Sequence, residues 1–285
     1  MAQELEIKLS VAQPDLDRAV DWLLGQPNTY ESETLQLGNT YYDTPDGDLN
    51  RHKIALRIRK VGDRHIQTLK TRGEFVDGAH RRQEWEWPLI GTTLNMGLIA
   101  DTPVGQSVNL AKLQPVFETN FQRRVVMIEQ GESLVEVAID SGEIVAGEQS
   151  RPLSEIEFEL KAGDASLLLT WARRLADEVP VFLNLVSKAE QGYYLAGLYN
   201  PVPKAVQHTE LSVNEFLFLL SVSWLTGQPV PADRDNFGAI GRMAGERGVQ
   251  DLYQHVFRSL AEGTSIGEMV ASRELGQLQL AIAAA

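Results

Sequence analysis

The chain contains no cysteine in its 285 residues, which excludes disulfides, thiolate nucleophiles and cysteine-based zinc sites. Long apolar runs are also missing, since the most apolar stretch, residues 216–225, has about half the length that a bilayer-spanning helix needs. The N-terminus begins with a charged segment, not with a basic stretch followed by an apolar signal. These absences predict a cytoplasmic protein without a membrane span.

Familiar catalytic signatures are absent as well: there is no glycine-rich phosphate loop, dinucleotide fingerprint, His-Glu-x-x-His or nucleophile elbow. Any chemistry therefore has to rest on carboxylates, basic side chains and a metal ion. The net charge of −13 argues against a general nucleic-acid binder. Yet residues 51–82 carry ten Lys or Arg against three acids, which indicates a site for a small anionic ligand.

Charged side chains alternate with apolar ones in several short runs. Near the N-terminus, Glu4, Glu6 and Lys8 alternate with apolar residues. A β-strand turns successive side chains to opposite faces, so such a run has one charged face and one apolar face. The same alternation recurs at Arg57 and Arg59, Thr68 and Lys70, Glu84 and Glu86, Glu136 and Asp140, and Glu155, Glu157 and Glu159.

Two architectures fit this alternation. An antiparallel sheet with one solvated side accounts for each strand by itself, but it does not explain why acids and bases segregate by strand. A barrel with a polar lumen and an apolar exterior covered by helices explains both observations, because opposed walls can hold a polyanion and the metal that neutralises it. We therefore favour the barrel.

Periodicity and turn residues predict the order of the elements. Helices are expected over 14–25 and 164–179, and strands over 1–10, 36–43, 53–61, 65–72, 81–88, 121–130, 133–140, 143–148 and 153–161. Beyond Pro201-Val-Pro203, which has the composition of a linker, three or four helices are expected. Two capping boxes, Ser212 with Glu215 and Ser265 with Glu268, support them.

Nine of these features, taken in order, resemble the CYTH superfamily, also called triphosphate tunnel metalloenzymes. They are Glu4-x-Glu6-x-Lys8, Tyr41-Tyr42-Asp43-Thr44-Pro45, Leu56-Arg57-Ile58-Arg59, Thr68-Leu69-Lys70-Thr71, Glu84-x-Glu86, Arg123, Asp140, Glu155-x-Glu157-x-Glu159, and Ser187-Lys188 with Gly192-Tyr193. The resemblance extends from residue 1 to about residue 200. Within the superfamily, the chain is most similar to bacterial inorganic triphosphatases that combine a tunnel domain with a helical CHAD domain.

The resemblance implies an α+β fold in two parts. Residues 1–200 would form an eight-stranded antiparallel β-barrel tunnel with a charged lumen and flanking helices. Residues 204–285 would form a small helical domain. This tail is shorter and less basic than a CHAD domain usually is, so a short CHAD-like segment and an unrelated lid both stay open.

The resemblance also implies the site residues. A divalent metal ion, Mg²⁺ or Mn²⁺, would be held by Glu4, Glu6, Asp140, Glu155 and Glu157. The triphosphate would be bound by Lys8, Arg57, Arg59, Lys70, Arg123 and Lys188. The catalytic candidates are Lys8, Glu84 and Asp140, whereas Glu159 continues the acidic face and ranks lower.

Some neighbouring side chains are expected to be structural. Arg82 and Glu86 are interpreted as an ion pair on the wall. Arg124 should point outward, because its neighbour in sequence takes the inward side. Tyr41 and Tyr42 are interpreted as packing groups.

The implied activity is metal-dependent hydrolysis of inorganic triphosphate to pyrophosphate and phosphate. One alternative is an enzyme for an organic triphosphate, either a thiamine triphosphatase or a class IV adenylate cyclase-like enzyme acting on ATP. Another is a non-enzymatic polyphosphate-binding module. The expected partner is a small-molecule triphosphate, with no nucleic acid and no membrane, and the oligomeric state stays open.

Overall fold

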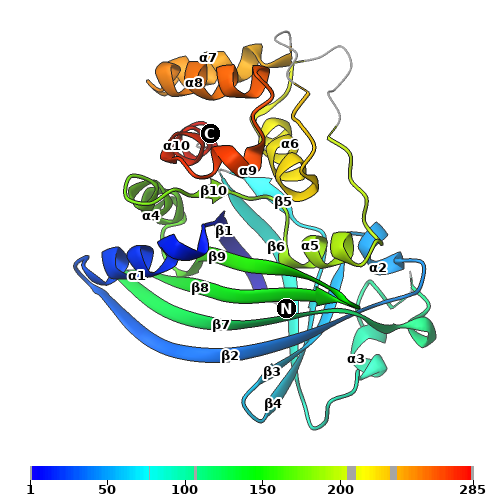
Figure 1. The fold of residues 1–285 in the computed structure, drawn as a ribbon. Coiled ribbons are helices and arrows are strands. Elements are labelled where there is room, and N and C mark those ends of the chain that lie inside the picture. The colour runs from blue at the N-terminus through cyan, green and yellow to red at the C-terminus, as the bar shows by residue number, and fades with distance from the viewer. Residues whose placement is uncertain (1, 77, 106–107, 204–209, 232–235, 284–285) are drawn as a thin grey trace.

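The centre of the molecule is an antiparallel β-barrel. A computed structural model describes residues 2–76, 78–105, 108–203, 210–231 and 236–283. The barrel strands are β1 (Ala2–Ser10), β2 (Thr29–Asp43), β3 (Ala55–Val61), β4 (Arg64–Lys70), β6 (Ala79–Leu89), β7 (Gln114–Gln130), β8 (Ser133–Ala146) and β9 (Gln149–Ala162). They pair in the order β1-β9-β8-β7-β2-β3-β4-β6, and β6 pairs back with β1. The expected eight-stranded barrel is thereby confirmed (Figure 1).

Two short strands extend the sheet beyond the closed barrel. β5 (Glu74–Val76) pairs with β6, and β10 (Phe182–Leu183) pairs with β1. On the edge of β1 opposite β9, β6 pairs with residues 2–6, and β10 pairs with the same edge farther along, at Leu9 and Ser10. The chain segment that follows β10 therefore lies directly beside β1.

The strands are longer and more continuous than predicted. β8 runs without a break, whereas the sequence predicted an interruption after residue 140. Glycine often weakens a strand, but Gly142 stays in the ladder. A Cβ at this position would lie 2.2 Å from the carbonyl oxygen of Asn120, so glycine lets β7 and β8 approach closely. β2 and β7 exceed their predicted limits because they pair with each other along nearly their whole length.

Helices cover the apolar exterior of the barrel. α1 (Leu16–Leu24) and α4 (Ser166–Ala176) confirm the predicted amphipathic helices, and the rings of Trp22 and Trp171 meet edge to face with centroids 6.1 Å apart. Both helices bury their apolar side against the strands. The other helices before the tail are α2 (Asp48–Arg51), α3 (Met96–Ala100), α5 (Lys188–Leu195) and the 3₁₀ turns Gln13–Asp15 and Leu110–Lys112.

The tail is helical, as predicted, but it has one more helix than the upper expectation. Its helices are α6 (Val213–Thr226), α7 (Gly238–Glu246), α8 (Gln250–Ala261), α9 (Ile266–Met269) and α10 (Arg273–Ala283). Residues 210–231 and 236–283 contain no strand. Both predicted capping boxes form, at the start of α6 and of α9. Within the described ranges, no helix is long and apolar enough to cross a bilayer.

The tail shares a hydrophobic core with the outside of the barrel. Leu217 and Leu220 of α6 and Leu278 of α10 belong to the same buried cluster as Ile7 of β1 and Phe158 of β9. Figure 1 shows α10 above β10 and α6 above β5, with α7 and α8 farther from the barrel. The predicted junction at residue 204 lies outside the described residues, so the division into domains 1–200 and 204–285 stays a prediction.

A pair of substitutions on α6 tests this shared core. Leu220 is fully buried, so we expect Leu220→Ala to lower the free energy of unfolding by about 2–5 kcal/mol. Phe218 lies on the same helix but is 41% exposed, and we expect Phe218→Ala to cost less than about 1 kcal/mol. Denaturant unfolding followed by tryptophan fluorescence measures both values. Equal losses for the two variants would contradict the shared core.

Candidate active site

The lumen of the barrel is a cavity of about 310 Å³ lined mainly by charged side chains. Alternation along the strands directs one charged face of each strand inward. The charged lining consists of Glu4, Glu6, Lys8, Arg57, Arg59, Lys70, Arg82, Glu84, Glu86, Arg123, Glu136, Glu157, Glu159, Lys161 and Lys188. Acids and bases thus share one confined volume, and many of them pair with one another.

Glu4 and Glu6 of β1 share one guanidinium group, that of Arg82 on β6. Arg82 Nε donates to Glu4 Oε2 and Arg82 Nη2 donates to Glu6 Oε1, both at 2.7 Å. Lys70 Nζ donates to Glu4 Oε1 at 2.7 Å and lies 3.3 Å from Glu84 Oε1. Burial alone would raise the pKa of Glu4, but Lys70 and Arg82 outweigh it and lower that pKa. At Glu6 burial dominates and raises the pKa to about 7, so the two acids differ in their affinity for a proton.

A second ionic cluster forms around Lys188, the first residue of α5. Lys188 Nζ lies 2.9 Å from both Asp140 Oδ2 and Glu155 Oε2, and 2.7 Å from Glu157 Oε1. Arg123 of β7 donates to both oxygens of Asp140 at 2.7 Å and to Glu157 Oε2 at 2.9 Å. Burial alone would lower the pKa of Lys188, but the three carboxylates raise it well above its usual range. The cluster therefore holds its charges as paired ions.

Lys8 lies near both clusters and has a different partner. Its ammonium donates to the backbone carbonyl oxygen of Val186, and its side chain is almost completely buried. Burial lowers the pKa of Lys8, although the carboxylates of Glu155 and Glu6 oppose this effect. Because its hydrogen bond goes to a carbonyl and not to a carboxylate, the Lys8 ammonium can gain a counter-charge from an anionic ligand, which would favour its charged form.

Arg57 and Arg59 of β3 have neutral hydrogen-bond partners in the lumen. Arg57 Nη1 donates to the hydroxyl of Tyr41 at 3.3 Å, and the buried Arg57 Nε has no hydrogen-bond partner among the residues that the structure describes. Arg59 Nε donates to Asn39 Oδ1 at 3.1 Å. Burial and the nearby charge of Arg57 lower the pKa of Arg59 to about 10. Two adjacent guanidinium groups that share no carboxylate form the part of the lumen best suited to an anion.

The structure brings the predicted site residues together, in two layers. All of them line the lumen except Asp140 and Glu155, which are buried behind Lys188. Glu155 Oε1 also accepts a hydrogen bond from Gln191 Nε2 at 2.7 Å. Asp140 and Glu155 therefore do not line the lumen themselves but hold the Lys188 side chain that does.

The role predicted for Arg82 is wrong. The sequence paired it with Glu86, but its ion pairs go to Glu4 and Glu6. Those partners lie on β1, which becomes a neighbour of β6 only when the barrel closes. The sequence did indicate that Arg82 faces the lumen, because alternation along the strand places it on the same face as Glu84 and Glu86.

Two other side-chain predictions are confirmed. Arg124 points outward and its Nε lies 3.0 Å from Glu31 Oε1 on the outer surface. Tyr41 packs in a stacked arrangement on Phe117, with ring centroids 4.5 Å apart. Tyr41 also lines the lumen, a role that the sequence did not indicate.

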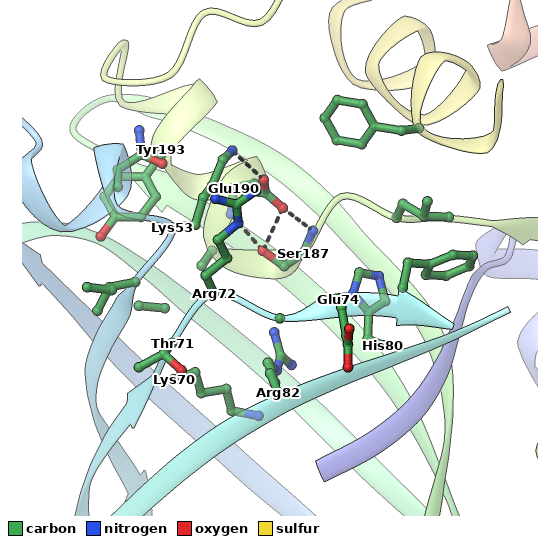
Figure 2. A pocket seen from close by; sticks show the side chains of 18 of the residues that line it. Lys53, Lys70, Thr71, Arg72, Glu74, His80, Arg82, Ser187, Glu190 and Tyr193 are labelled. Carbon is green, nitrogen blue, oxygen red and sulfur yellow. Dashed lines mark hydrogen bonds and ion pairs between the residues drawn. The ribbon is translucent and has the colours of Figure 1, made fainter. Parts of the chain in front are cut away.

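A second cavity, of about 450 Å³, adjoins the lumen on the side of the tail. It shares Lys70, Arg82 and Ser187 with the lumen lining. Figure 2 shows Ser187 and Glu190 on one wall of this cavity, with Lys53 reaching toward Glu190. That contact joins Lys53 Nζ to Glu190 Oε1 at 2.9 Å. Helix α6 contributes another part of the wall, so the tail borders the approach to the charged lumen.

The carboxylates of the lumen have the right chemistry for a divalent metal ion. Carboxylate oxygens are the ligands that Mg²⁺ and Mn²⁺ prefer. In the part of the chain that the structure describes, no three Asp, Glu or His side chains already converge as a coordination site. Glu4, Glu6 and Glu157 each hold a Lys or Arg side chain instead. The residues thus fit a divalent cation by donor type, and binding it requires them to exchange these partners.

This arrangement can be compared with known families. The CYTH domain matches residues 2–193, which contain every barrel strand and most of α5. The chain belongs to the CYTH family. The match ends before the helices of the tail.

One relative is an inorganic triphosphatase of Haemophilus influenzae. It is 41% identical to this chain over 197 residues, which make up 68% of this chain and 55% of that protein. The CYTH chain described here therefore spans about half the length of the curated relative it matches. The remainder of that relative has no counterpart in the matched residues.

Solved structures show weaker similarity. A putative adenylyl cyclase from Hippeastrum, described as having a dominant triphosphatase activity, is 18% identical, with 70% of this chain and 98% of that chain covered and a TM-score of 0.49. A putative adenylate cyclase from Bacillus halodurans is 16% identical, with 62% and 90% covered and a TM-score of 0.41. At this level the similarity carries no argument about substrate.

Asp140 offers a stability test of the second ionic cluster. It is fully buried between Arg123 and Lys188, so Asp140→Asn leaves two buried cations with less compensating charge. We expect the free energy of unfolding to fall by about 3–5 kcal/mol. Glu143→Gln on the same strand is exposed and should change it by less than about 0.5 kcal/mol. Urea unfolding at neutral pH measures the free energy of unfolding of both variants. A loss below about 1 kcal/mol for Asp140→Asn would contradict the ionic network.

His80 offers a pH test. Burial lowers its pKa to about 3, and the charges of Lys8 and Arg82 act in the same direction. Because the unfolded chain binds this proton at higher pH than the folded one, the contribution of His80 to stability is present above about pH 6.5 and is lost as the pH falls toward about 3. We expect His80→Gln to lose less stability than wild type between pH 7 and pH 4. Identical pH dependence in urea unfolding would show that His80 does not titrate in this way.

Proposed function

We propose that this protein hydrolyses inorganic triphosphate to pyrophosphate and phosphate in the lumen, with the help of a divalent metal ion. The observation that carries the proposal is the pair of Arg57 and Arg59, whose side-chain hydrogen bonds within the described residues go to neutral groups. Cations in a confined lumen are costly without a counter-charge, and a triphosphate supplies several negative charges on a narrow chain. Membership of the CYTH family and the similarity to an inorganic triphosphatase support the same substrate class.

Substrate binding is assigned to the basic side chains of the lumen. Guanidinium groups form paired, charge-assisted hydrogen bonds to phosphate oxygens, and ammonium groups add point charges. The same contacts stabilise the charge that spreads over the transferring phosphoryl group. The proposed binding residues are Lys8, Arg57, Arg59, Lys70, Arg123 and Lys188.

Metal binding is assigned to the acidic side of the lumen, where Glu4, Glu6 and Glu157 face inward and Asp140 and Glu155 lie behind them. A bound Mg²⁺ or Mn²⁺ would neutralise phosphate charge and make a water molecule more acidic. A triphosphate gives Lys70, Arg123 and Lys188 new anionic partners. Their carboxylates then become available to a cation.

Lys8, Glu84 and Asp140 are the proposed catalytic group. Water adds to a terminal phosphorus atom, the bond from that phosphorus to the bridging oxygen breaks, and the water gives up a proton. Glu84 lines the lumen, and among the residues that the structure describes its one ion-pair partner is Lys70, at 3.3 Å, so we assign it the proton. Lys8 stabilises the negative charge that develops on the phosphate oxygens. Asp140 contributes by holding Arg123 and Lys188.

This proposal requires one partner, a small-molecule triphosphate. Neither nucleic acid nor a membrane enters it, in keeping with the net charge of −13. The lack of cysteine agrees with the predicted cytoplasmic location without deciding it.

Phosphate release tests the proposed function. The substrates are inorganic triphosphate, thiamine triphosphate, ATP and pyrophosphate, each with Mg²⁺, Mn²⁺ or a chelator. We expect metal-dependent release with a preference for inorganic triphosphate. Arg59→Ala should lower kcat/KM by about 10²–10³-fold, because it removes a charge that stabilises the transition state. Glu4→Ala should lower it too, with a greater requirement for metal.

Lys60→Ala is the matched control, since Lys60 follows Arg59 on the same strand but is exposed outside the lumen. It should behave like wild type. A preference for thiamine triphosphate or ATP would replace the proposed substrate with an organic one. Binding of triphosphate without any metal-dependent release would replace the enzyme with a polyphosphate-binding module.

A further inference from the structure

Residues 182–187, here called the connecting segment, comprise β10 and the four residues that lead into α5. They determine where two lysines of the lumen lie. The carbonyl oxygen of Val186 accepts the hydrogen bond of the Lys8 ammonium. Lys188, directly after the segment, begins α5 and reaches three carboxylates. A shift of this backbone would therefore move the carbonyl group that Lys8 binds, and it would also move the backbone that carries the Lys188 side chain.

The inner edge of the connecting segment is bound to β1. The backbone N–H of Asn184 donates to the carbonyl oxygen of Lys8 at 3.1 Å. The side-chain Nδ2 of Asn184 donates to Ser10 Oγ at 2.9 Å, and its Oδ1 accepts from the N–H of Val186 at 3.0 Å. These bonds continue the sheet, but they leave the backbone groups of the opposite edge without a neighbouring strand.

Two buried side chains of the tail take the place of that strand. Gln279 of α10 accepts from the N–H of Leu183 through Oε1 and donates to its carbonyl oxygen through Nε2, both at 3.0 Å. Ser221 Oγ of α6 accepts from the N–H of Leu185 at 3.0 Å. Both side chains are fully buried. Since buried backbone groups require partners, Gln279 and Ser221 fix the outer edge of the segment.

The helix that carries Gln279 is itself held close to this part of the chain. A Cβ on Gly276 would lie 2.1 Å from the carbonyl oxygen of Val181, so α10 packs directly on the backbone just before the segment. Ser221 is in turn oriented by its hydrogen bond to the carbonyl oxygen of Leu217, at 2.9 Å. Both anchors therefore lie on the buried faces of their helices.

We infer that Gln279 and Ser221 are positioning residues of the active site, which act through the connecting segment on the ammonium groups of Lys8 and Lys188. The inference rests on the proposed function, because it assigns the tail a role in that reaction. Both residues lie beyond residue 193, where the match to the CYTH family ends. The tail thus contributes to the lumen without entering it.

A merely structural role for Gln279 predicts something different. In that case its loss would lower stability, and activity would fall only as far as the folded fraction does. The test therefore needs a variant that destabilises the same helix equally and leaves the connecting segment bonded. Leu278→Ala is such a control, because Leu278 is the neighbouring residue on α10 and is fully buried in the hydrophobic core.

The experiment compares the full chain with Gln279→Met, Ser221→Ala and Leu278→Ala. Met keeps the length and unbranched shape of Gln but has no amide to bond Leu183. For each protein, the measurements are the melting temperature, kcat and KM for inorganic triphosphate, and deuterium exchange of peptides that cover residues 182–187. Binding of inorganic triphosphate by calorimetry is measured as well.

We expect Gln279→Met to lose about tenfold or more in kcat/KM at temperatures where it is fully folded, because small displacements of reacting groups are costly. Exchange in residues 182–187 should become faster, and Ser221→Ala should show the same effects more weakly. Leu278→Ala should melt earlier but retain wild-type kcat/KM and slow exchange in the segment. Wild-type kcat/KM in Gln279→Met, or a loss no greater than that of Leu278→Ala, would overturn the inference.

The outcome is separable from that of the proposed function. If wild type hydrolyses no triphosphate under any metal condition, the proposed function fails. Exchange and triphosphate affinity then decide the positioning role. Weaker binding with faster exchange in Gln279→Met would support it, and unchanged binding would overturn it.

Discussion

The confinement of opposite charges inside a closed barrel is the constraint on which the rest of the structure depends. Ionised groups can leave bulk water only when other charges or hydrogen bonds compensate them. Closure meets this condition, because it brings β1 beside both β6 and β9. Glu4 and Glu6 of β1 then meet Arg82 of β6, and α5, which contacts β9, adds Lys188 to Glu157. The same contacts that close the barrel thereby define the site.

The proposed function rests on the positive charges that have no carboxylate partner within the described residues. Arg57 and Arg59 form hydrogen bonds to neutral groups, and Lys8 bonds a backbone carbonyl oxygen. An anionic ligand adds counter-charge where the protein has least of it. Because the proposed metal ligands are also members of the ion pairs, ligand binding and stability are expected to be linked.

The helical tail also supports the barrel and its site from outside. Its apolar side chains complete the core outside β1 and β9, and its α6 borders the cavity next to the lumen. Gln279 and Ser221 replace a missing strand at the edge of the sheet. The tail is therefore joined to the site by packing and by hydrogen bonds, although residues 210–231 and 236–283 supply no charged group to the lumen lining.

The sequence by itself determined which side chains share a face, since side-chain direction along a strand is a local property of period two. That sufficed to place Lys8, Arg57 and Glu157 on charged faces and to locate the capping boxes of the tail. Only the tertiary structure decided which charges pair. Arg82 meets Glu4 instead of its sequence neighbour Glu86, because strand neighbours depend on barrel closure. The same long-range packing buries Asp140 and Glu155 behind Lys188 and brings Gln279 to Leu183, and no local pattern encodes such contacts.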